Sequence, residues 1–273
     1  MTPPTTNSML AVLQDAYGTA DTWHTGQTAV PKIKDKEVLV KIVAAGLDRG
    51  TWHLMTGLPY LGRLAFGIRK PKNPVPGRDL TGTIVAIGSS VTRFAVGDTV
   101  FGIGSGSFAE YAAAREDKLA RTPTNLRVCS TAKVDLVRSL GADQVIDYTK
   151  TDFADGTEHY RLIIDIGGSS PLSRLRRALT HQGTLVIVGG EGGRELTGMG
   201  RQLRAVALSP FVSQRLTMLV PKEHYGDLDK LTEPIEAGTV TPSVGCTYPL
   251  DQAADAMHQL AAGQVHGKIA ITT

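Results

Sequence analysis

The feature that most constrains the fold is a change in rhythm near residue 126. Before it, short runs rich in β-branched residues alternate with glycine and proline turns, at Glu37–Ala45, Leu80–Ile87, Asp98–Ile103 and Phe108–Ala114. Short strands at this spacing are typical of a small barrel or sandwich. After residue 126, apolar strand-like runs alternate with helix-like runs, and this alternation predicts βαβ units around a parallel sheet.

The second half is predicted in more detail as follows. We expect strands at Arg127–Thr131, Asp143–Asp147, Arg161–Ile166, Thr184–Val188 and Leu203–Leu208. We expect helices at Lys133–Leu140 and Pro171–Leu179, and then a helix at Pro249–Ala262 followed by a strand at Lys268–Thr272. Ligands of parallel sheets bind at the carboxyl ends of the strands. The turns that follow Thr131, Ile166 and Val188 are therefore the places to look for a site.

Composition excludes several classes of protein. The chain of 273 residues is 41% hydrophobic and 20% charged, which excludes a disordered chain, and no run approaches the ~18 apolar residues of a membrane helix. The first ten residues contain neither a basic residue nor an apolar core, so we expect a soluble cytoplasmic protein with no membrane partner. Cys129 and Cys246 are too few for a disulfide framework.

Charge gives little information about partners. The 29 basic and 26 acidic residues leave a net charge of +3, and one basic cluster stands out, formed by Arg63, Arg69, Lys70, Lys72 and Arg78. Nucleic-acid binding needs a continuous basic stripe with stacking aromatic residues, which this cluster lacks. A solvated loop is the favoured interpretation, and attraction of an anionic cofactor is the alternative.

Several longer motifs point to one family. They are AAGLDRGTWHLMTG (44–57), PGRDLTGTIVAIGSSVTRFAVGDTVFG (76–102), GSFAEYAAA (106–114), DIGG (165–168), GTLVIVGG (183–190) and GKIAI (267–271). In this order they resemble the zinc-independent branch of the medium-chain dehydrogenase/reductase family, the NADPH-dependent quinone and enone reductases. The resemblance implies an α/β protein with a GroES-like β-barrel substrate domain at 1–126, a Rossmann-like nucleotide-binding domain at 127–248, and a C-terminal return to the first domain at 249–273.

The positions that hold zinc in related enzymes have other residues here. Zinc-using relatives place a cysteine near Leu47 or Asp48 and a His-Glu pair where this chain has Arg78 and Asp79. An arginine has no lone pair to offer a metal. The seven histidines show neither the spacing of a helical metal pair nor that of a cysteine-histidine site. We therefore expect a site without zinc.

The resemblance also assigns candidate site residues. It places Asp48 and His53 in the nicotinamide and substrate cleft, although each is alternatively a capping or surface residue. It places the following residues against NADP(H): Ser130, Thr131, Lys133, Tyr148, Gly167, Gly168, Gly189, Gly190 and His266. Ser130 and Lys133 suit the 2′-phosphate of NADP, which favours donors and positive charge. The alternatives are a helix cap, a solvated helix face, a packed tyrosine and ordinary turn glycines.

One element of the family is missing. A Rossmann domain opens with a strand, a glycine-rich turn and a helix that together bind the pyrophosphate. Here the segment 123–126 is joined directly to the strand-like segment 127–131, and a parallel crossover needs at least ~10–12 residues. The first βα unit is therefore absent. That strand is central in the sheet order, so we expect weakened or absent NADPH binding. Either the two halves of the sheet pair directly, or another segment or subunit fills the gap, or the domain is poorly packed; an unpaired central edge would favour aggregation.

Two functions remain open at this stage. The first is an oxidoreductase that transfers hydride from NADPH to a quinone or enone as its small-molecule partner, without metal. The second is a catalytically inactive, internally deleted relative that acts as a binding or interaction protein or has no function. The resemblance also makes a homodimer an expectation.

Overall fold

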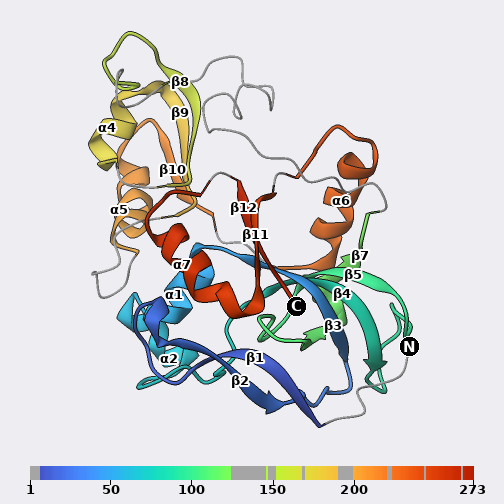
Figure 1. Cartoon of the computed structure of the whole chain (residues 1–273). Coiled ribbons are helices and arrows are strands. Elements are labelled where there is room, and N and C mark those ends of the chain that lie inside the picture. Colours follow the sequence, from blue (N-terminus) through green and yellow to red (C-terminus); the bar gives the residue numbers. More distant parts are fainter. Residues whose placement is uncertain are drawn as a thin grey trace. The chain divides into compact units, whose positions relative to one another are not determined.

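The computed structural model describes residues 7–123, 146, 152–167, 170–189, 199–219, 223–242, 244–265 and 267–273 (Figure 1). The chain divides into two compact units, and each is described by itself. The larger unit comprises residues 1–57, 65–133 and 223–273, and the smaller comprises residues 58–64 and 134–222.

A seven-stranded sheet forms the centre of the larger unit. Its strand order is β11-β12-β3-β4-β5-β7, and β6 pairs with β3 beside this path. The strands are β3 (Glu37–Leu47), β4 (Asp79–Ile87), β5 (Thr99–Ile103), β6 (Tyr111–Arg115), β7 (Leu119–Arg121), β11 (Val244–Pro249) and β12 (Lys268–Thr272). This described path is open, and its strands do not close into a barrel.

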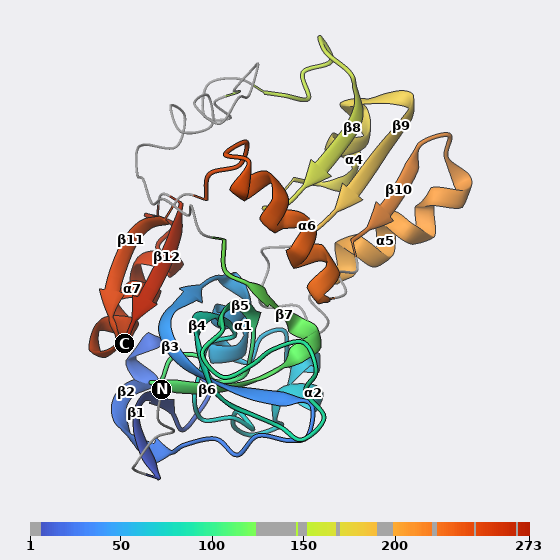
Figure 2. The same ribbon diagram turned by 90° about the vertical axis from the view of Figure 1, so that its right-hand side faces the viewer.

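Strand β3 is the organising strand of this sheet. One of its edges pairs antiparallel with β4, in a register that runs from Val38 opposite Ile87 to Ala44 opposite Thr81. Its first half also pairs with β6, and its last four residues pair with β12, so that Leu47 lies opposite Ile269 (Figure 2). The sheet therefore joins the beginning, the middle and the end of the described chain.

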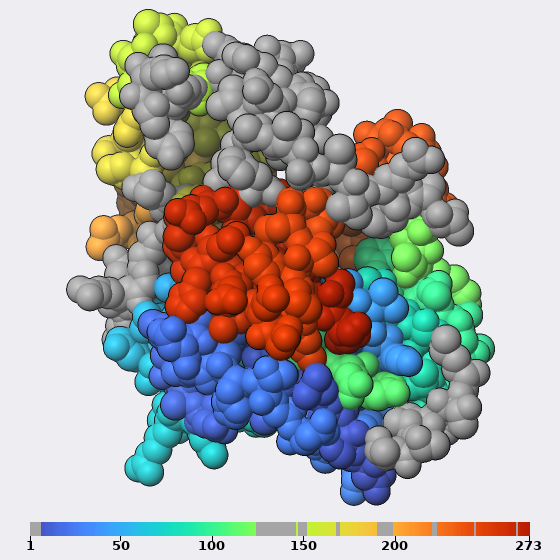
Figure 3. Space-filling view, in the orientation of Figure 1, coloured from blue at the N-terminus to red at the C-terminus, as the bar shows by residue number. Residues whose placement is uncertain are grey.

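A separate antiparallel pair, β1 (Ser8–Gln14) and β2 (Trp23–Ala29), packs against this sheet. The amide of Val12 donates to the carbonyl oxygen of Phe108 at 2.9 Å, which ties β1 to the segment before β6. Helix α7 (Ala253–Ala261), which follows the 3-10 turn Leu250–Gln252, contacts β2. In Figure 3 the red C-terminal elements lie directly against the blue N-terminal pair.

Shorter elements complete the larger unit. They are the 3-10 turns Ala20–Thr22 and Glu116–Lys118, and the helices α1 (Arg49–Thr56) and α6 (Tyr225–Glu236). The turn Tyr60–Gly62 and helix α2 (Arg63–Phe66) lie along the chain between α1 and β4. Arg93 holds α6, because its guanidinium lies 3.5 Å from the ring centre of Tyr225 and 3.4 Å from a carboxylate oxygen of Asp229.

Alternation along the strands builds the core of the larger unit. In β3 and β4 the buried residues recur at every second position over most of each strand, which places them on one face. The fully buried large side chains of this core are Leu47, Ile84, Phe108, Leu119, Met257, Ile269 and Ile271.

The smaller unit holds a parallel sheet of order β10-β9-β8. Its elements are β8 (Tyr160–Asp165), α4 (Leu172–Arg177), β9 (Leu179–Ile187), α5 (Gly200–Leu208), the 3-10 turn Ser209–Phe211 and β10 (Arg215–Met218). Leu185 and Ile187 of β9 are fully buried, with Leu175 of α4 and Ala205 of α5 packed in the same cluster. This is the strand–helix alternation that the sequence predicts.

The predicted fold class is confirmed: a GroES-like unit accompanies a Rossmann-like parallel sheet. The strands expected at 37–45, 80–87, 98–103, 108–114, 161–166, 184–188 and 268–272 are present with shifted ends, as are the helices expected at 171–179 and 249–262. The elements expected between residues 127 and 147 lie outside the described residues, apart from residue 146. The exact domain limits stay a prediction.

The strand expected at Leu203–Leu208 is wrong, because these residues belong to helix α5. Gln202 and Ala205, three positions apart, are buried, whereas Leu203 is 51% exposed. A spacing of three is that of a helix face. The last strand of the smaller unit is instead β10, which pairs in parallel with β9.

Ile84 provides a test of the core of the larger unit. This side chain of β4 is completely buried, whereas Val43 of β3 is 61% exposed. We expect Ile84→Ala to lower the free energy of unfolding by about 2–5 kcal/mol, because it leaves a cavity. Val43→Ala, the matched control, should change it by less than about 0.5 kcal/mol. Urea unfolding monitored by tryptophan fluorescence measures both, and equal effects would contradict the assignment.

Candidate functional site

Asp48 caps helix α1. Its carboxylate oxygen accepts hydrogen bonds from the amide of Thr51 at 2.8 Å and from the Thr51 hydroxyl at 2.9 Å. The helix ends at Gly57, whose φ of +63° is left-handed and whose amide donates to the carbonyl oxygen of His53. The structure therefore gives Asp48 a local structural role, which the sequence analysis held as the alternative to a catalytic one.

His53 lies on the same helix, five residues after Asp48. Its imidazole ring makes an edge contact with the half-buried ring of Trp52, at 5.0 Å between centroids. Trp52 packs in turn against the main core of the larger unit. Asp48 and His53 are thus held on one short, well-supported element, and their assignment to catalysis stays a prediction.

Asp79 is the most perturbed acid near this helix. It is the first residue of β4, and a Cβ atom added at Gly46 of β3 would lie 2.9 Å from the Asp79 Cβ. Burial raises the pKa of Asp79 to about 6, and the negative charge of Asp48 adds to the rise, against the opposing charges of Lys268 and Arg78. A carboxyl with this pKa changes its protonation near neutral pH.

Arg78 precedes Asp79 and belongs to a group of charges. Its Nη2 atom donates to both carboxylate oxygens of Glu223 at 2.8 Å, and Lys118 Nζ donates to Glu223 Oε2 at 2.8 Å. Burial acts to raise the pKa of Glu223, but the hydrogen bond from Lys118 and the two positive charges outweigh it, so this pKa lies below its ordinary value. Glu223 therefore stays ionised between two cations.

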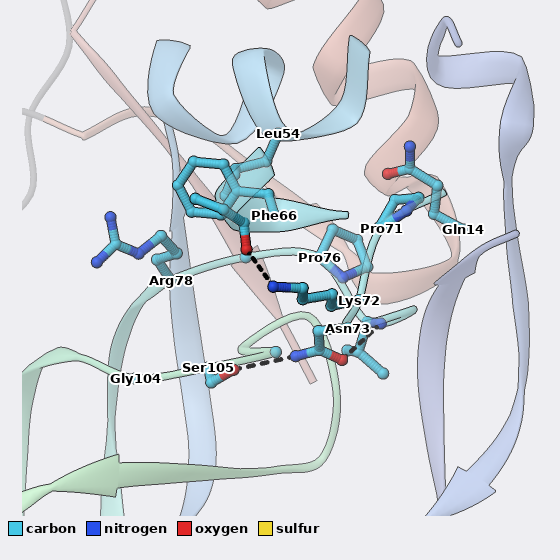
Figure 4. A pocket seen from close by; sticks show the side chains of 14 residues that line it. Gln14, Leu54, Phe66, Pro71, Lys72, Asn73, Pro76, Arg78, Gly104 and Ser105 are labelled. Atoms are coloured by element: carbon cyan, nitrogen blue, oxygen red, sulfur yellow. Dashed lines mark hydrogen bonds between the residues drawn. The ribbon is translucent and has the colours of Figure 1, made fainter. Parts of the chain in front are cut away.

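A cavity of about 240 Å³ opens beside Arg78. Leu54 of α1, Phe66, Pro71, Val75 and Pro76 supply most of its apolar wall (Figure 4). Gly77, Gly104 and Gly106 bring bare backbone to the wall. At Gly77, which has φ +90°, a Cβ atom would lie 2.5 Å from the Phe108 ring, so no side chain fits there.

Polar groups stand at the exposed rim of this cavity. Lys72 Nζ donates to the carbonyl oxygen of Ala65 at 2.8 Å, and the Asn73 amide donates to the Ser105 hydroxyl at 3.0 Å (Figure 4). Gln14 also reaches the wall, but its amide is engaged with the carbonyl oxygens of Ala16 and Met55. The cavity thus combines an apolar interior with amide, hydroxyl and ammonium groups at its mouth.

Two of the predicted cofactor glycines lie in the smaller unit, after β8 and β9. At Gly189 an added Cβ atom would lie 2.5 Å from the carbonyl oxygen of Ile166, so this position excludes a side chain. Gly167 has open space where a Cβ atom would stand. Gly167 is exposed and Gly189 is half-buried, and both follow neighbouring parallel strands at their carboxyl ends, the edge where dinucleotides bind in such sheets.

The remaining cofactor candidates lie outside the described residues: Ser130, Thr131, Lys133, Tyr148, Gly168, Gly190 and His266.

The structure brings Asp48 and His53 together at helix α1, and it places Gly167 and Gly189 just after the adjacent strands β8 and β9. Sequence reasoning missed Asp79, whose pKa the charge of Asp48 helps to raise, and the Arg78–Glu223–Lys118 group. The signal for Asp79 was present, since it is an acid at the start of an apolar strand.

Two observations bear on metals and membranes. Among the described residues, no group of three or more His, Cys, Asp and Glu side chains is arranged to hold a metal ion. No helix in the described part of the chain has the length and apolarity needed to cross a membrane. The expected absence of zinc stays a prediction.

The chain combines a GroES-like unit with a Rossmann-like parallel sheet, which is the fold of medium-chain dehydrogenases. Residues 34–124 match the alcohol dehydrogenase GroES-like domain, and residues 140–271 match the domain described as zinc-binding dehydrogenase. The chain belongs to the medium-chain dehydrogenase/reductase superfamily of oxidoreductases and is similar to its quinone oxidoreductase-like members. The two matches leave residues 125–139 between them, which includes the predicted junction.

Curated relatives are reductases of unsaturated carbonyl compounds and quinones. The chain is 27% identical to the chloroplastic NADPH-dependent alkenal/one oxidoreductase of Arabidopsis thaliana, over 89% of this chain and 73% of the relative. It is 24% identical to the quinone oxidoreductase of Sus scrofa, over 84% of this chain and 86% of the relative. The first alignment spans 315 residues, more than the 273 of the whole chain, so it contains positions of the relative with no counterpart here.

Solved structures share the fold. The quinone oxidoreductase of Coxiella burnetii superposes with a TM-score of 0.82 at 18% identity, over 97% of this chain and 99% of that one. The mycobacterial Rv1454c complexed with NADPH superposes with a TM-score of 0.78 at 19% identity, over 97% of this chain and 100% of that one.

The cap at Asp48 can be separated from any chemical role. We expect Asp48→Ala to lower the free energy of unfolding by about 1 kcal/mol, because the Thr51 amide loses its acceptor. Asp48→Asn keeps an acceptor and should retain most of that stability. Thermal unfolding followed by circular dichroism compares the two variants. If both destabilise equally, the carboxylate charge rather than the cap is what matters.

Asp79 makes stability depend on pH. Its pKa in the folded chain, about 6, exceeds the ordinary value of 3.8, so between these values the folded state holds a proton that the unfolded state has released. The stability contributed by the protonated group is therefore lost as pH rises through about 6. Relative to Asp79→Asn, the wild type should lose about 1–2 kcal/mol between pH ~4 and ~7, allowing for solvent screening. Urea unfolding across this range measures it, and a constant difference would contradict the raised pKa.

Proposed function

We propose that this chain is a metal-free reductase that transfers hydride from NADPH to a quinone or enone held in the cavity beside Arg78. The observation that carries the proposal is the cavity itself, which combines an apolar wall with hydrogen-bond donors in the GroES-like unit. NADPH-dependent relatives that act on alkenals and quinones support the same chemistry.

The cavity suits a small planar substrate. Its volume of about 240 Å³ is below the ~300–1,000 Å³ of pockets for drug-sized ligands, so one ring or a short enone is the expected occupant. Leu54, Phe66 and Pro76 would hold the apolar face of such a molecule. The polar rim would then receive its carbonyl oxygen.

Hydride addition places negative charge on that oxygen, and positioned donors stabilise it. NADPH, when bound, supplies the hydride. We assign the stabilising role to Lys72, whose ammonium group has three N–H donors and gives one to the Ala65 carbonyl oxygen. Ser105 is the second donor at the rim. The proton that completes the reduction comes from solvent, and the apolar wall limits water elsewhere.

Cofactor binding in this proposal rests on the smaller unit. The backbone at Gly167 and Gly189, which carries no side chain, would suit a nicotinamide ribose laid along the carboxyl edge of the sheet. The 2′-phosphate would be held by Ser130, Thr131, Lys133 and Tyr148, and the ring side by Gly168, Gly190 and His266. Without a glycine-rich loop the pyrophosphate lacks its backbone donors, so the affinity for NADPH should be low.

A specific observation favours a second function, that of an inactive deleted relative acting as a binding protein. Segment 123–126 is followed directly by segment 127–131. A crossover between two parallel strands needs at least ~10–12 residues, and none stand between these segments. A cytoplasmic location and the absence of a nucleic-acid partner belong to both proposals. The two functions differ in whether NADPH is bound and consumed.

A turnover assay and a binding assay with NADPH distinguish the reductase from the inactive relative. Purified protein should oxidise NADPH in the presence of p-benzoquinone or methyl vinyl ketone, followed by the loss of NADPH absorbance. NADPH fluorescence titration should show saturable but weak binding. Binding without turnover would favour the inactive relative, and tight saturable binding would contradict the predicted effect of the missing loop. No binding and no turnover would exclude the reductase proposal.

Lys72 provides the residue-level test. Because loss of a charge-assisted hydrogen bond costs about 1.5–3 kcal/mol, Lys72→Met should lower kcat/KM for the quinone by about 10- to 100-fold. The Kd of NADPH should not change. Lys70→Met, at an exposed neighbouring lysine, is the matched control and should leave kcat/KM near the wild-type value. Equal effects of the two variants would remove Lys72 from the proposed role.

A further inference from the structure

The segment that follows helix α2 forms a tight turn in the larger unit. The amide of Lys72 donates to the carbonyl oxygen of Phe66 at 2.8 Å, which closes the turn at its base. Gly67 is buried with φ +125°, and a Cβ atom there would clash with a backbone oxygen across the turn. The Tyr17 hydroxyl donates to the carbonyl oxygen of Gly67 at 2.6 Å. These bonds fix the shape of the turn.

Three consecutive side chains at the tip of this turn face solvent, and we call them the basic tip: Ile68, Arg69 and Lys70. Ile68 is 70% exposed, and no other large apolar side chain described in the larger unit is as exposed. Arg69 and Lys70 are exposed beside it. The turn therefore presents an aliphatic group and two cations together on a fixed backbone.

The positive charge of the basic tip is not neutralised by the chain around it. The sequence contains no acidic residue between Asp48 and Asp79. Among the described residues, no carboxylate forms an ion pair with Arg69, Lys70 or the neighbouring Lys72. The electrostatic potential around the tip is therefore positive, and it attracts an anionic surface.

An anionic lipid bilayer fits this combination of groups. Its headgroup region attracts basic side chains, and it accepts an aliphatic side chain without a shaped pocket. A nucleic acid would gain from aromatic side chains that stack on its bases, and residues 67–72 contain none. An acidic protein surface would pair with the bases, but it would need a matching pocket to gain from the aliphatic group.

We propose that the basic tip docks the protein on the surface of an anionic lipid bilayer. This is a peripheral contact, which needs no membrane-spanning helix, and it departs from the sequence-based expectation of no membrane partner. Phe66 and Pro71, on either side of the tip, line the cavity, so docking brings the cavity near the bilayer (Figure 4). The inference does not depend on the proposed reductase function, because it concerns binding to lipid in the absence of NADPH.

Vesicle sedimentation tests the docking. The full chain should sediment with vesicles of phosphatidylcholine mixed with phosphatidylglycerol and should stay in solution with vesicles of phosphatidylcholine alone, because the bases need anionic headgroups. High salt should weaken the binding, because it screens exposed charges. No binding to the mixed vesicles, or equal binding to both kinds, would overturn the proposal. Binding to heparin without binding to vesicles would also overturn it and assign the bases to a soluble polyanion.

Paired charge substitutions locate the contact. Each base near an anionic bilayer contributes about fivefold to the partition coefficient, so Arg69→Gln combined with Lys70→Gln should lower it about 20-fold. Lys36→Gln combined with Lys230→Gln is the matched control, because it removes the same charge from two exposed lysines of the same unit. The control should change the coefficient by less than about twofold. Equal effects would mean that binding follows net charge, and the basic tip would lose its proposed role.

The apolar part of the contact has its own test. Ile68→Ser should lower the partition coefficient about tenfold, because the tip loses the aliphatic group that enters the bilayer. Val43→Ser, at a 61% exposed position of β3, is the matched control and should leave the coefficient within about twofold of the wild-type value. Both side chains are exposed, so neither substitution removes a core contact. A coefficient unchanged by Ile68→Ser would contradict the insertion of this side chain.

A fluorescent label reports the contact directly. In a background with Cys129→Ser and Cys246→Ser, an environment-sensitive fluorophore is attached to Ile68→Cys or, as the control, to Val43→Cys. The emission of the label at position 68 should shift to the blue on the mixed vesicles, because the label leaves water, and the emission of the control should not shift. Sedimentation with vesicles but no shift at position 68 would assign the contact to another surface and overturn the proposal.

Discussion

The antiparallel hydrogen bonding of β3 is the constraint on which the larger unit depends. One strand of eleven residues receives β4 along one edge and β6 and then β12 along the other. The helix that carries Asp48 and His53 begins directly after this strand, and the strand that begins with Asp79 is its neighbour. The separation of the two acids is therefore set by sheet register rather than by any direct bond between them.

The cavity is built on the same frame. Its wall comes from four stretches of the chain, near Gln14, Leu54, residues 65–78 and residues 104–106, which the sheet and its loops bring together. Glycines with left-handed backbone at 77 and 106 let these stretches approach closely. A site of this kind has a well-supported apolar wall but few fixed polar groups, which is compatible with chemistry carried by a cofactor rather than by a set of catalytic side chains.

Sequence predicted the strands well where β-branched residues lie between glycine or proline turns, as in β3, β4, β5 and β12. The sequence-based prediction of a strand was wrong at α5. The run Leu203–Leu208 is apolar enough for a buried strand, and it is too short for its periodicity to distinguish a strand from a helix. The perturbed pKa of Asp79 was not predictable, since it arises from which strand lies next to β4. The cavity was not predictable either, because its wall joins separate stretches of the chain that run from Gln14 to Gly106. Asp48 was assigned from the family resemblance, and Gly167 and Gly189 because each follows a predicted strand; these assignments stay predictions.

The pairing of β12 with β3 also has a consequence for how the chain is made. Residues 269–272 must return to residues 44–47, so the last described strand closes a loop that contains the whole smaller unit. On the ribosome, the first strands of the larger unit emerge long before their last partner does. Until β12 is synthesised, the edge of β3 that it covers is open. That open edge can pair with another nascent chain made from the same messenger RNA, so such pairing must be prevented.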